Sequence, residues 1–253
     1  MGEALCVKNL CKTYVANKRQ NNVLKNVNFT IMEGEMVAVM GPSGSGKSTL
    51  LYSVSGMDRP TAGEVRLGGK RITDLTEKEL ANVRLTSMGF IFQQMHMLKN
   101  LSIMDNILLP AYQAGKGGRT RQEINGYCIS LMKKLGISDV AEHDITEVSG
   151  GQLQRACICR SLMNQPQILF ADEPTGALNR SSSEDVMQEL KKLNEEGTTI
   201  MLVTHDMKVA AKCSRILYIV DGNIKGELRM EEDGAEGKFR ERRLNQWLIE
   251  MGW

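Results

Sequence analysis

Residues 41–49, GPSGSGKST, form the feature that most limits what this chain can fold into. They follow an apolar run at 36–40, which is typical of a strand buried on both faces, and they precede a segment with helical character. A strand, the pattern G-x-x-x-x-G-K-[ST] and a helix together predict a phosphate-binding P-loop. The alternative is a flexible glycine and serine turn that binds nothing, and the flanking strand and helix argue against it.

Each residue type in this loop has a physical reason to be there. Glycines let the backbone curl so that successive N–H groups point at phosphate oxygens, and the positive end of the following helix adds to the attraction. Lys47 would neutralise the β- and γ-phosphates, Ser48 would give a hydroxyl oxygen to Mg²⁺, and Thr49 would support the α-phosphate. The residues expected to bind a nucleoside triphosphate here are Gly41, Pro42, Ser43, Gly44, Ser45, Gly46, Lys47, Ser48 and Thr49.

Two carboxylates follow a second apolar run. Residues 168–174, ILFADEP, predict a buried strand that ends in Asp172 and Glu173. Ligands bind at the carboxyl edge of open α/β sheets, and neighbouring residues at a strand end point in different directions. Asp172 would therefore hold Mg²⁺ through its water shell, while Glu173 polarises the attacking water. Two acidic residues that merely end a strand are the alternative, which the P-loop in the same chain weakens.

A second helix start with anion-binding character lies at 147–156, EVSGGQLQRA. Ser149, Gly150 and Gly151 precede a helix expected to begin near Gln152, so the helix dipole would attract an anion there. One nucleotide does not need two such cradles from one molecule. Two copies that face each other head to tail would use both, with the serine and glycines of one copy on the γ-phosphate held by the other's P-loop.

Composition excludes several classes of protein. A chain of 253 residues with 42% hydrophobic side chains can bury the core of one large domain, and two compact halves stay possible. Because the formal net charge is only +2, no nucleic acid partner is expected. The six cysteines have no CxxC spacing and are expected to be reduced thiols. There is no secretory signal and no apolar run of about 18 residues, so any action at a membrane needs another chain to cross it.

The order of the expected elements predicts a parallel sheet with helical crossovers. Residues 95–163 are mostly helical in pattern, and Pro110 and the GKGG at 115–118 are expected to break the helices. The tail from Glu231 begins as a charged linker and ends in an amphipathic helix. The other expected elements are a short hairpin at 58–72, strands at 167–171 and 198–204, a helix at 181–197 and a closing hairpin at 215–228.

With these motifs, the chain resembles the ATP-binding cassette (ABC) ATPases, the nucleotide-binding subunits of ABC transporters. The resemblance covers about residues 4–228 and implies an α/β fold of the P-loop NTPase type, with a mixed or parallel sheet core, an antiparallel β subdomain and an α-helical subdomain at about 95–163. The ATPase domain would span 1–230, and 231–253 would be the charged linker and amphipathic helix. The family's motifs occur in its order as Walker A at 41–49, the Q-loop FQQ at 92–94, the signature VSGGQ at 148–152, Walker B ILFADE at 168–173, the D-loop GALN at 176–179 and the switch segment VTHD at 203–206.

The resemblance also implies roles for residues outside the P-loop. Tyr14 is similar to the aromatic residue that stacks on adenine, although it could equally be a core tyrosine. Gln93, rather than Gln94, would touch Mg²⁺ and the lytic water, Glu173 would be the general base, and His205 would contact the γ-phosphate. The implied cofactors are ATP and Mg²⁺, with the metal held by Ser48, Gln93 and Asp172 and the γ-phosphate capped across the dimer by Ser149, Gly150, Gly151 and Gln152.

The D-loop departs from the family pattern at two positions. The chain has Asn179 where the family usually has aspartate, and Gly176 where many relatives have serine. Asparagine keeps a side chain that forms hydrogen bonds, and it loses the charge. The resemblance gives this loop the role of communication across the dimer to the opposite P-loop, so the change is expected to affect the strength of that role and not its kind.

In three features the chain is similar to the branch of the family that contains MacB, LolD and the antimicrobial-peptide resistance systems of Gram-positive bacteria. These features are the sequence EPTGALN, the short Q-loop GFIFQQ and the compact length. The resemblance implies a peripheral subunit at the cytoplasmic face of the cell membrane. ATP-driven closure of a head-to-tail dimer would move a separate membrane permease in export or antimicrobial-peptide resistance. Two alternatives stay open: signalling through a membrane partner that transports nothing, and a soluble ABC ATPase that acts on ribosomes or DNA.

Two segments are candidates for contact with a permease. The tail helix would lie either against a membrane or permease or on its own domain, and we expect the second. Its apolar face is made of Leu244, Trp247, Leu248 and Met251. The segment after the Q-loop would form either part of the core or the groove that receives a permease helix. The apolar side chains of this segment are Met95, Met97, Leu98, Leu101 and Met104.

Overall fold

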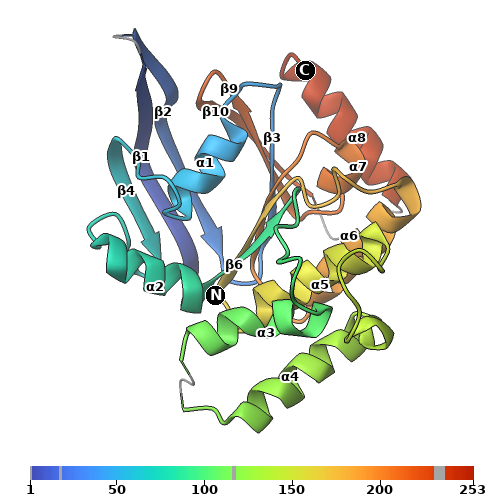
Figure 1. Ribbon diagram of the computed structural model, residues 1–253. Coiled ribbons are helices and arrows are strands. Elements are labelled where there is room, and N and C mark those ends of the chain that lie inside the picture. Colours follow the sequence, from blue (N-terminus) through green and yellow to red (C-terminus); the bar gives the residue numbers. More distant parts are fainter. Residues whose placement is uncertain (1, 17–18, 116–117, 231–236) are drawn as a thin grey trace.

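The computed structural model describes residues 2–16, 19–115, 118–230 and 237–253, and within them the strands form two sheets (Figure 1). The antiparallel sheet has the order β2-β1-β4-β5, with β1 (Glu3–Ala16), β2 (Arg19–Met32), β4 (Ala62–Leu67) and β5 (Lys70–Arg71). The second sheet has the order β10-β9-β3-β8-β7-β6, with β3 (Met36–Met40), β6 (Met88–Phe92), β7 (Ile168–Asp172), β8 (Ile200–Val203), β9 (Arg215–Val220) and β10 (Asn223–Arg229). It is parallel except for β10, so the expected mixed α/β fold class is confirmed.

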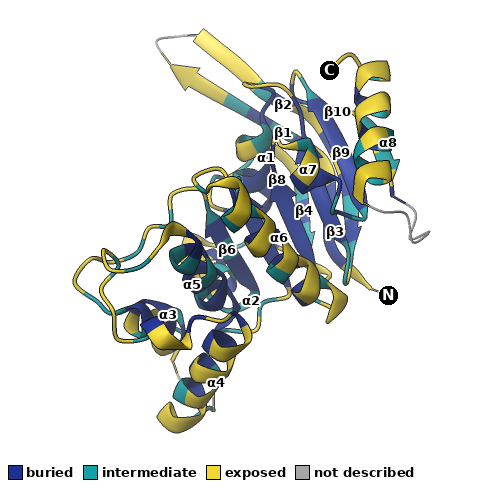
Figure 2. Cartoon of the chain, turned by 90° about the vertical axis from the view of Figure 1, so that its right-hand side faces the viewer, coloured by how far each residue is buried: buried dark blue, intermediate teal, exposed yellow. Residues whose placement is uncertain are grey.

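Helices pack around the second sheet and extend away from it. Figures 1 and 2 show α3 and α4 together at one end of the molecule and α8 at the opposite side, beside β9 and β10. Residues 231–236, where the charged linker is expected, lie outside the described residues. The helices are α1 (Lys47–Val54), α2 (Glu77–Ser87), α3 (Ile103–Gln113), α4 (Arg121–Lys134), the short 3₁₀ helix η1 (Ser138–Val140), α5 (Gly150–Leu162), α6 (Arg180–Glu195), α7 (Met207–Ala210) and α8 (Gly237–Glu250).

Strand β3 shows why the run before the P-loop is continuously apolar. Side chains alternate between the two faces of a strand. Val37 and Val39 pack in the cluster formed with the antiparallel sheet and α1, whereas Met36, Ala38 and Met40 pack in the cluster formed with the helices on the other face. All five side chains are buried, so neither face of β3 can carry a polar residue.

Helix α2 and strand β6 are not among the elements expected from the sequence. Thr76 caps α2, because its hydroxyl accepts from the Glu79 N–H while the Glu79 carboxylate accepts from the Thr76 N–H at 2.8 Å. This capping box, T-x-x-E at 76–79, is the sequence signal that identifies the helix. Strand β6 has the apolar sequence MGFIF and pairs with β7 at the end of the sheet, which places the Q-loop beside Walker B.

The expected helical stretch is wrong at its start and at its proline. Residues 95–102 are not helical, and Ser102 caps α3, which starts at Ile103. Pro110 does not break this helix, which continues for three more residues. An interior proline costs a helix about 3 kcal/mol. Burial of the apolar face of α3, where Ile107 is completely inaccessible to solvent, outweighs this cost.

The tail helix α8 packs on the second sheet of its own chain, as expected. Leu244 and Leu248 are fully buried, and the Trp247 ring meets the Tyr218 ring edge-on with 6.1 Å between their centroids. Gly226 in β10 provides the space, because a Cβ there would lie 2.9 Å from the Trp247 ring. The seat of α8 on the sheet therefore depends on the absence of a side chain at this position.

We expect Gly226→Ala to lower the free energy of unfolding by about 1–3 kcal/mol, because the added methyl overpacks against Trp247. Both tryptophans of the chain, Trp247 and Trp253, lie in or directly after α8, so tryptophan fluorescence during chemical denaturation reports on this helix.

The matched control is Gly126→Ala in α4. Position 126 is exposed, and an added Cβ there meets no atom within 4 Å. Alanine favours the helical conformation over glycine, so this variant should gain about 0.5–1 kcal/mol. Equal effects of the two substitutions would show that the seat of α8 does not depend on Gly226.

Candidate functional site

The carboxyl ends of four neighbouring strands bring together residues that lie far apart in the sequence. β3, β8, β7 and β6 are side by side and parallel, and the chain leaves them at Gly41, Thr204, Glu173 and Gln93. Because the carboxyl ends of parallel strands meet at the same edge of a sheet, Walker A, the switch segment, Walker B and the Q-loop share this edge.

The P-loop has the backbone geometry that its glycines permit. A Cβ at Gly41 would lie 2.1 Å from the carbonyl oxygen of Ile219, and Gly46 has a φ of 101°. Pro42, Ser43 and Gly44 are exposed. Gly46 is the N-cap of α1, and no side chain caps this helix. The first N–H groups of α1 are thus not used by a side-chain cap, which suits a helix start that binds an anion.

Lys47 folds back over this loop. Its ammonium donates to the carbonyl oxygens of Gly41 at 2.9 Å and Pro42 at 3.0 Å. Burial lowers the pKa of the Lys47 ammonium, and the carboxylates of Glu173 and Asp172 oppose this shift. A cation is therefore held at the loop, close to both acidic residues of Walker B.

Asp172 is buried at the end of β7 and joins Walker B to the P-loop helix. Its two carboxylate oxygens accept from the Ser48 hydroxyl at 3.1 Å and the Tyr52 hydroxyl at 2.8 Å. Burial and the hydrogen bond to Asp172 raise the pKa of Tyr52 to about 12, so this phenol stays a donor at neutral pH.

The pair of Ser48 and Asp172 fits Mg²⁺. This ion prefers hard oxygen ligands, and it is commonly held by one or two protein groups together with phosphates and water. Among the described residues, no cluster of three or more His, Cys, Asp and Glu side chains could hold a metal ion. The chemistry of the site therefore suits an ion that shares its coordination with a nucleotide and not one bound by protein alone.

Glu173 is held by two groups from the switch segment. Its Oε1 lies 2.7 Å from Nδ1 of His205, and its Oε2 accepts from the Thr204 hydroxyl at 3.3 Å. Glu173 has a φ of 47°, in the left-handed region, which is a strained conformation of the kind that clusters at functional sites. The His205 side chain is 71% exposed and that of Glu173 only 16%, so the imidazole stands between the carboxylate and solvent.

The two D-loop residues that depart from the family pattern, Gly176 and Asn179, each contact another part of this chain. A Cβ at Gly176 would lie 2.9 Å from the side-chain amide nitrogen of Gln93, so a serine at this position would press on this Q-loop side chain. Asn179 caps α6, because its Oδ1 accepts from the Ser182 N–H at 2.9 Å. Asparagine is among the best N-cap residues, so Asn179 has a structural function within its own chain.

The signature segment starts α5 and does not join the P-loop of its own chain. Ser149 and Gln152 form a capping box, and Gly151 packs on α6, since a Cβ there would lie 3.1 Å from the Ser182 hydroxyl. In the part of the chain that the structure describes, no hydrogen bond or ion pair links residues 149–152 to residues 41–49.

Tyr14 lies on β1 and is 41% exposed. Its hydroxyl donates to Asp58 at 2.5 Å, and the Lys12 ammonium donates to the same carboxylate and lies 4.8 Å from the centre of the ring. Burial and the contact with Asp58 raise the pKa of Tyr14, and Thr49 of the P-loop acts on it in the opposite direction. Tyr14 is therefore a partly exposed ring close to the P-loop and not a core tyrosine.

Three partners of site residues are not found by motif reasoning. Tyr52 stands four residues after Ser48 and thus on the same face of α1, which is a signal present in the sequence. Thr204 lies in the switch segment, but no motif marks it as a partner of Glu173, and Asp58 lies in no motif; the fold brings them to Glu173 and Tyr14.

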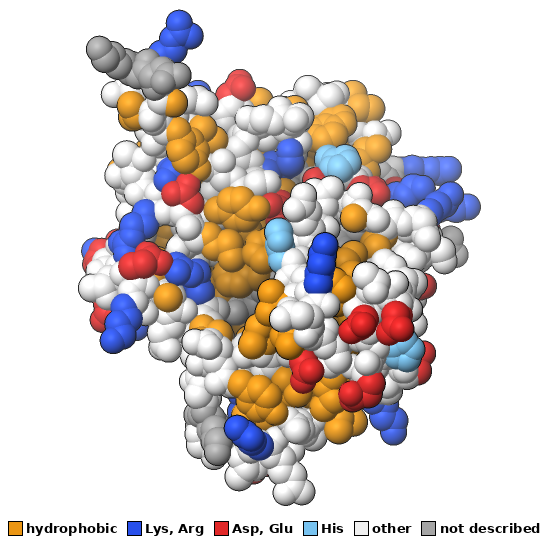
Figure 3. Space-filling view, viewed as in Figure 1, with side chains coloured by type: hydrophobic (Ala, Val, Ile, Leu, Met, Phe, Trp, Pro, Cys, Tyr) orange, Lys and Arg blue, Asp and Glu red, His pale blue; other side chains and the backbone are white. Residues whose placement is uncertain are grey.

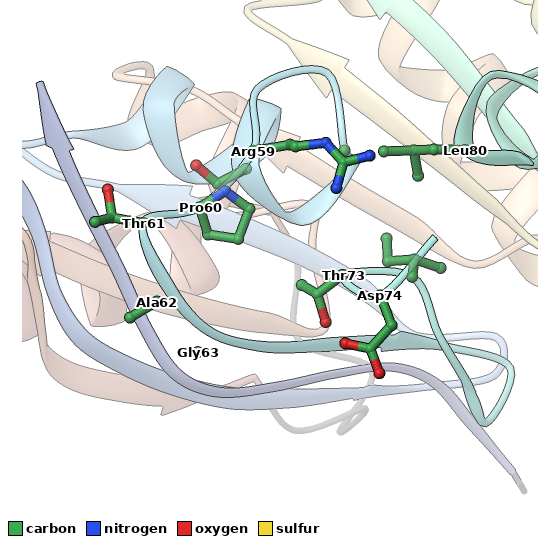
Figure 4. Close-up of a pocket in the computed structure, with 11 residues that line it drawn as sticks. Arg59, Pro60, Thr61, Ala62, Gly63, Thr73, Asp74 and Leu80 are labelled. Carbon is green, nitrogen blue, oxygen red and sulfur yellow. The ribbon is translucent and has the colours of Figure 1, made fainter. Parts of the chain in front are cut away.

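Figure 4 shows a pocket that contains none of the predicted site residues. Its volume is about 180 Å³, and it lies between the end of α1, the turn at 59–63 and the segment before α2. The Arg59 guanidinium reaches toward Leu80 on one side of this pocket, while Thr73 and Asp74 lie on the other (Figure 4). This pocket is separate from the edge of the sheet at which the four motifs meet.

None of the helices in the described ranges combines the length and apolar character needed to span a bilayer.

Comparisons with known proteins give the family. The profile of the family described as ABC transporter matches residues 24–176. The chain is 44% identical over 218 residues to the ABC transporter ATP-binding protein YknY of Bacillus subtilis, which is 86% of this chain and 94% of that protein. It is 43% identical over 226 residues to the macrolide export ATP-binding/permease protein MacB of Psychrobacter cryohalolentis. That match covers 89% of this chain and 34% of MacB, so the chain spans about a third of that relative.

Solved structures agree with these relatives. The fold matches the dimeric ABC transporter cassette MJ0796 of Methanocaldococcus jannaschii with a TM-score of 0.82 at 41% identity, over 90% of this chain and 99% of that one. A second structure of MJ0796, with a TM-score of 0.82 at 40% identity, is a post-hydrolysis state bound to ADP and Pi. The chain therefore belongs to the ABC transporter family, as one of its ATP-binding ATPase cassettes.

Proposed function

We propose that two copies of this chain close head to tail around two molecules of MgATP and that this closure moves a separate membrane permease. The observation that carries the proposal is the meeting of Lys47, Asp172, Glu173 and His205 at one edge of the sheet. Phosphate binding, metal binding and proton transfer each have a group there. The chain would work as a peripheral subunit at the cytoplasmic face of the membrane.

The catalytic steps follow from the geometry of these side chains. The P-loop N–H groups and the Lys47 ammonium hold the β- and γ-phosphates. To do so, Lys47 gives up its hydrogen bonds to the carbonyl oxygens of Gly41 and Pro42 and donates to phosphate oxygens instead. Ser48, Asp172 and Gln93 would hold Mg²⁺, and this ion would supply positive charge to the phosphates. Glu173 accepts a proton from the attacking water, and His205 orients this carboxylate and contacts the γ-phosphate. Tyr14 offers its ring face to adenine.

The second copy supplies what one chain lacks. Gly150 and Gly151 begin α5, so their N–H groups have no acceptor within the helix. Ser149 and Gln152 brace this helix start through their capping box. We propose that these four residues cap the γ-phosphate held by the partner copy. The MJ0796 cassette is dimeric, which supports the presence of a second copy.

The Glu173→Gln variant tests the assignment of the base. We expect ATP turnover to fall by about 10²–10⁴-fold, because the amide cannot take the proton of the water. ATP binding should persist, and gel filtration with ATP should show a stable dimer. The control Glu195→Gln makes the same change at an exposed site at the end of α6 and should leave turnover unchanged. Normal hydrolysis by Glu173→Gln would rule out Glu173 as the base.

Mixing two inactive variants tests whether the site is shared. Lys47→Ala damages the P-loop side, and Ser149→Phe damages the signature side. In a head-to-tail dimer, a mixed pair contains one site with both halves intact, so the mixture should regain ATPase activity that neither variant has alone. If one chain made a complete site by itself, no mixing ratio would restore turnover.

An apolar groove offers a surface for the permease. It has a volume of about 450 Å³ and lies between α2, β6 and α3, and Figure 3 shows hydrophobic side chains gathered in the centre of this face. MacB carries a permease in the same chain as its ATP-binding part, and this supports a permease as the kind of partner. The apolar lining includes Met57, Met88, Phe90, Phe92, Leu109 and Pro110.

The groove differs from the segment that the sequence suggested. Met95, Met97, Leu98, Leu101 and Met104 are absent from its lining, and Met97 and Met104 pack against the core. By its similarity to MacB, we propose an export role, which includes export that gives resistance to antimicrobial peptides. We further propose residues 1–230 as the ATPase domain, with its helical subdomain at about 95–163, and residues 231–253 as an addition to it.

The Leu109→Asp variant tests the groove. Leu109 is 43% exposed at the groove, and a charge there should prevent an apolar permease helix from docking. We expect loss of copurification with the membrane permease proposed as the partner, while ATP binding persists. Ile129→Asp places the same charge on α4 at a side chain that is 53% exposed and outside the groove, and it should leave the complex intact. Equal loss in both variants would contradict the assignment.

A further inference from the structure

Helix α8 reaches the segment that follows His205. The views in Figures 1 and 2 agree that α7 and α8 are neighbours, and the two helices contact each other. A cavity of about 420 Å³ lies beside them. Glu173 and His205 line this cavity together with Glu241 of α8. The tail of the chain thus comes next to the two residues proposed for the hydrolytic step.

Arg240 of α8 makes polar contacts with this segment. Its guanidinium donates to the carbonyl oxygens of Ala211 at 2.8 Å and Cys213 at 2.6 Å. Ala211 is the C-cap of α7, and Cys213 belongs to the connection from α7 to β9. A cation that bonds the last carbonyls of a helix stabilises its C-terminal end.

Helix α7 needs such support because it has only four residues. A helix this short is not stable by itself, so tertiary contacts fix its orientation. Its other end is the N-cap Asp206, whose side chain accepts from the Lys208 N–H at 2.7 Å. His205 directly precedes this cap, so the orientation of α7 determines where the imidazole lies relative to Glu173.

The packing of α8 on its own domain fixes the position of Arg240. Leu244 and Leu248 are completely buried in the core on the same helix, one and two turns further on. A guanidinium on a helix held in this way can fix α7 from outside the sheet. Arg242 lies on the same helix but is exposed, so it provides a comparison of equal charge.

We propose that Arg240 is a positioning residue for the switch segment, which holds α7 so that the His205 imidazole stays against the Glu173 carboxylate. This inference rests on the catalytic roles proposed above for His205 and Glu173. It assigns the tail helix a part in ATP turnover, which the motifs of the family do not contain. Arg240 touches neither nucleotide nor metal in this scheme.

The chain has three histidines, so the ring signals of His205 can be followed by NMR. Arg240→Ala should move these signals and leave those of His96 and His143 in place. The kcat for ATP should fall by about three- to tenfold, well below the ~10²-fold that a displacement of 1 Å can cost, while KM stays unchanged because the P-loop is untouched. Arg242→Ala should change neither quantity.

Arg240→Lys supplies the test by rescue. An ammonium can still donate to a carbonyl, although without the fork of the guanidinium, so its kcat and His205 signals should lie between those of Arg240→Ala and the unaltered chain. If Arg240→Ala does not fold, as circular dichroism would show, Arg240→Lys and Arg240→Gln decide the question by the same two measurements. Unmoved His205 signals in a folded Arg240 variant would overturn the proposal.

A wrong assignment of His205 as a catalytic residue would give a different result from a wrong assignment of Arg240. If His205→Ala turns over ATP at the normal rate, the role of His205 in hydrolysis is wrong. The NMR measurement still decides whether Arg240 positions the switch segment, because it needs no nucleotide.

Discussion

The parallel pairing of β3, β8, β7 and β6 is the constraint on which the rest of the structure depends. It brings four loops to one edge of the sheet, although they are separated by up to 164 residues between Gly41 and His205. Each strand is apolar on both faces, so burial of both faces holds the strands together in the core. The core therefore fixes the strand ends, and the reactive groups lie on the segments that leave them.

Motif chemistry was enough to identify this edge from the sequence, because a P-loop and an acidic strand end require the same local geometry wherever they occur. Lys47, Ser48, Asp172, Glu173 and His205 all lie there. The roles of these residues stay proposals, since their positions alone do not show the reaction. The hairpins and the tail helix were also predictable, because turn residues and an amphipathic face are local signals.

Other features could not be read from local signals. Pro110 predicts a break, but the gain from burying α3 is a tertiary effect that no window of sequence contains. Thr204 and Asp58 contact site residues only because strands far apart in sequence pair with each other. The apolar groove likewise draws its lining from α2, β6 and α3, whereas the sequence offered only the segment 95–104, as either core or groove.

The hydrogen bond from Tyr14 to Asp58 has a consequence for the choice of nucleotide. Because the Tyr14 hydroxyl gives its proton to Asp58, it cannot donate to a base, and in the role proposed above Tyr14 would bind a base through the flat π surface of its ring. Guanine presents the same kind of surface as adenine, so stacking does not distinguish the two purines. Any selectivity for adenine over guanine beside Tyr14 would have to come from neighbouring polar groups. Without such groups, the relative abundance of the two triphosphates in the cell would decide which one is hydrolysed.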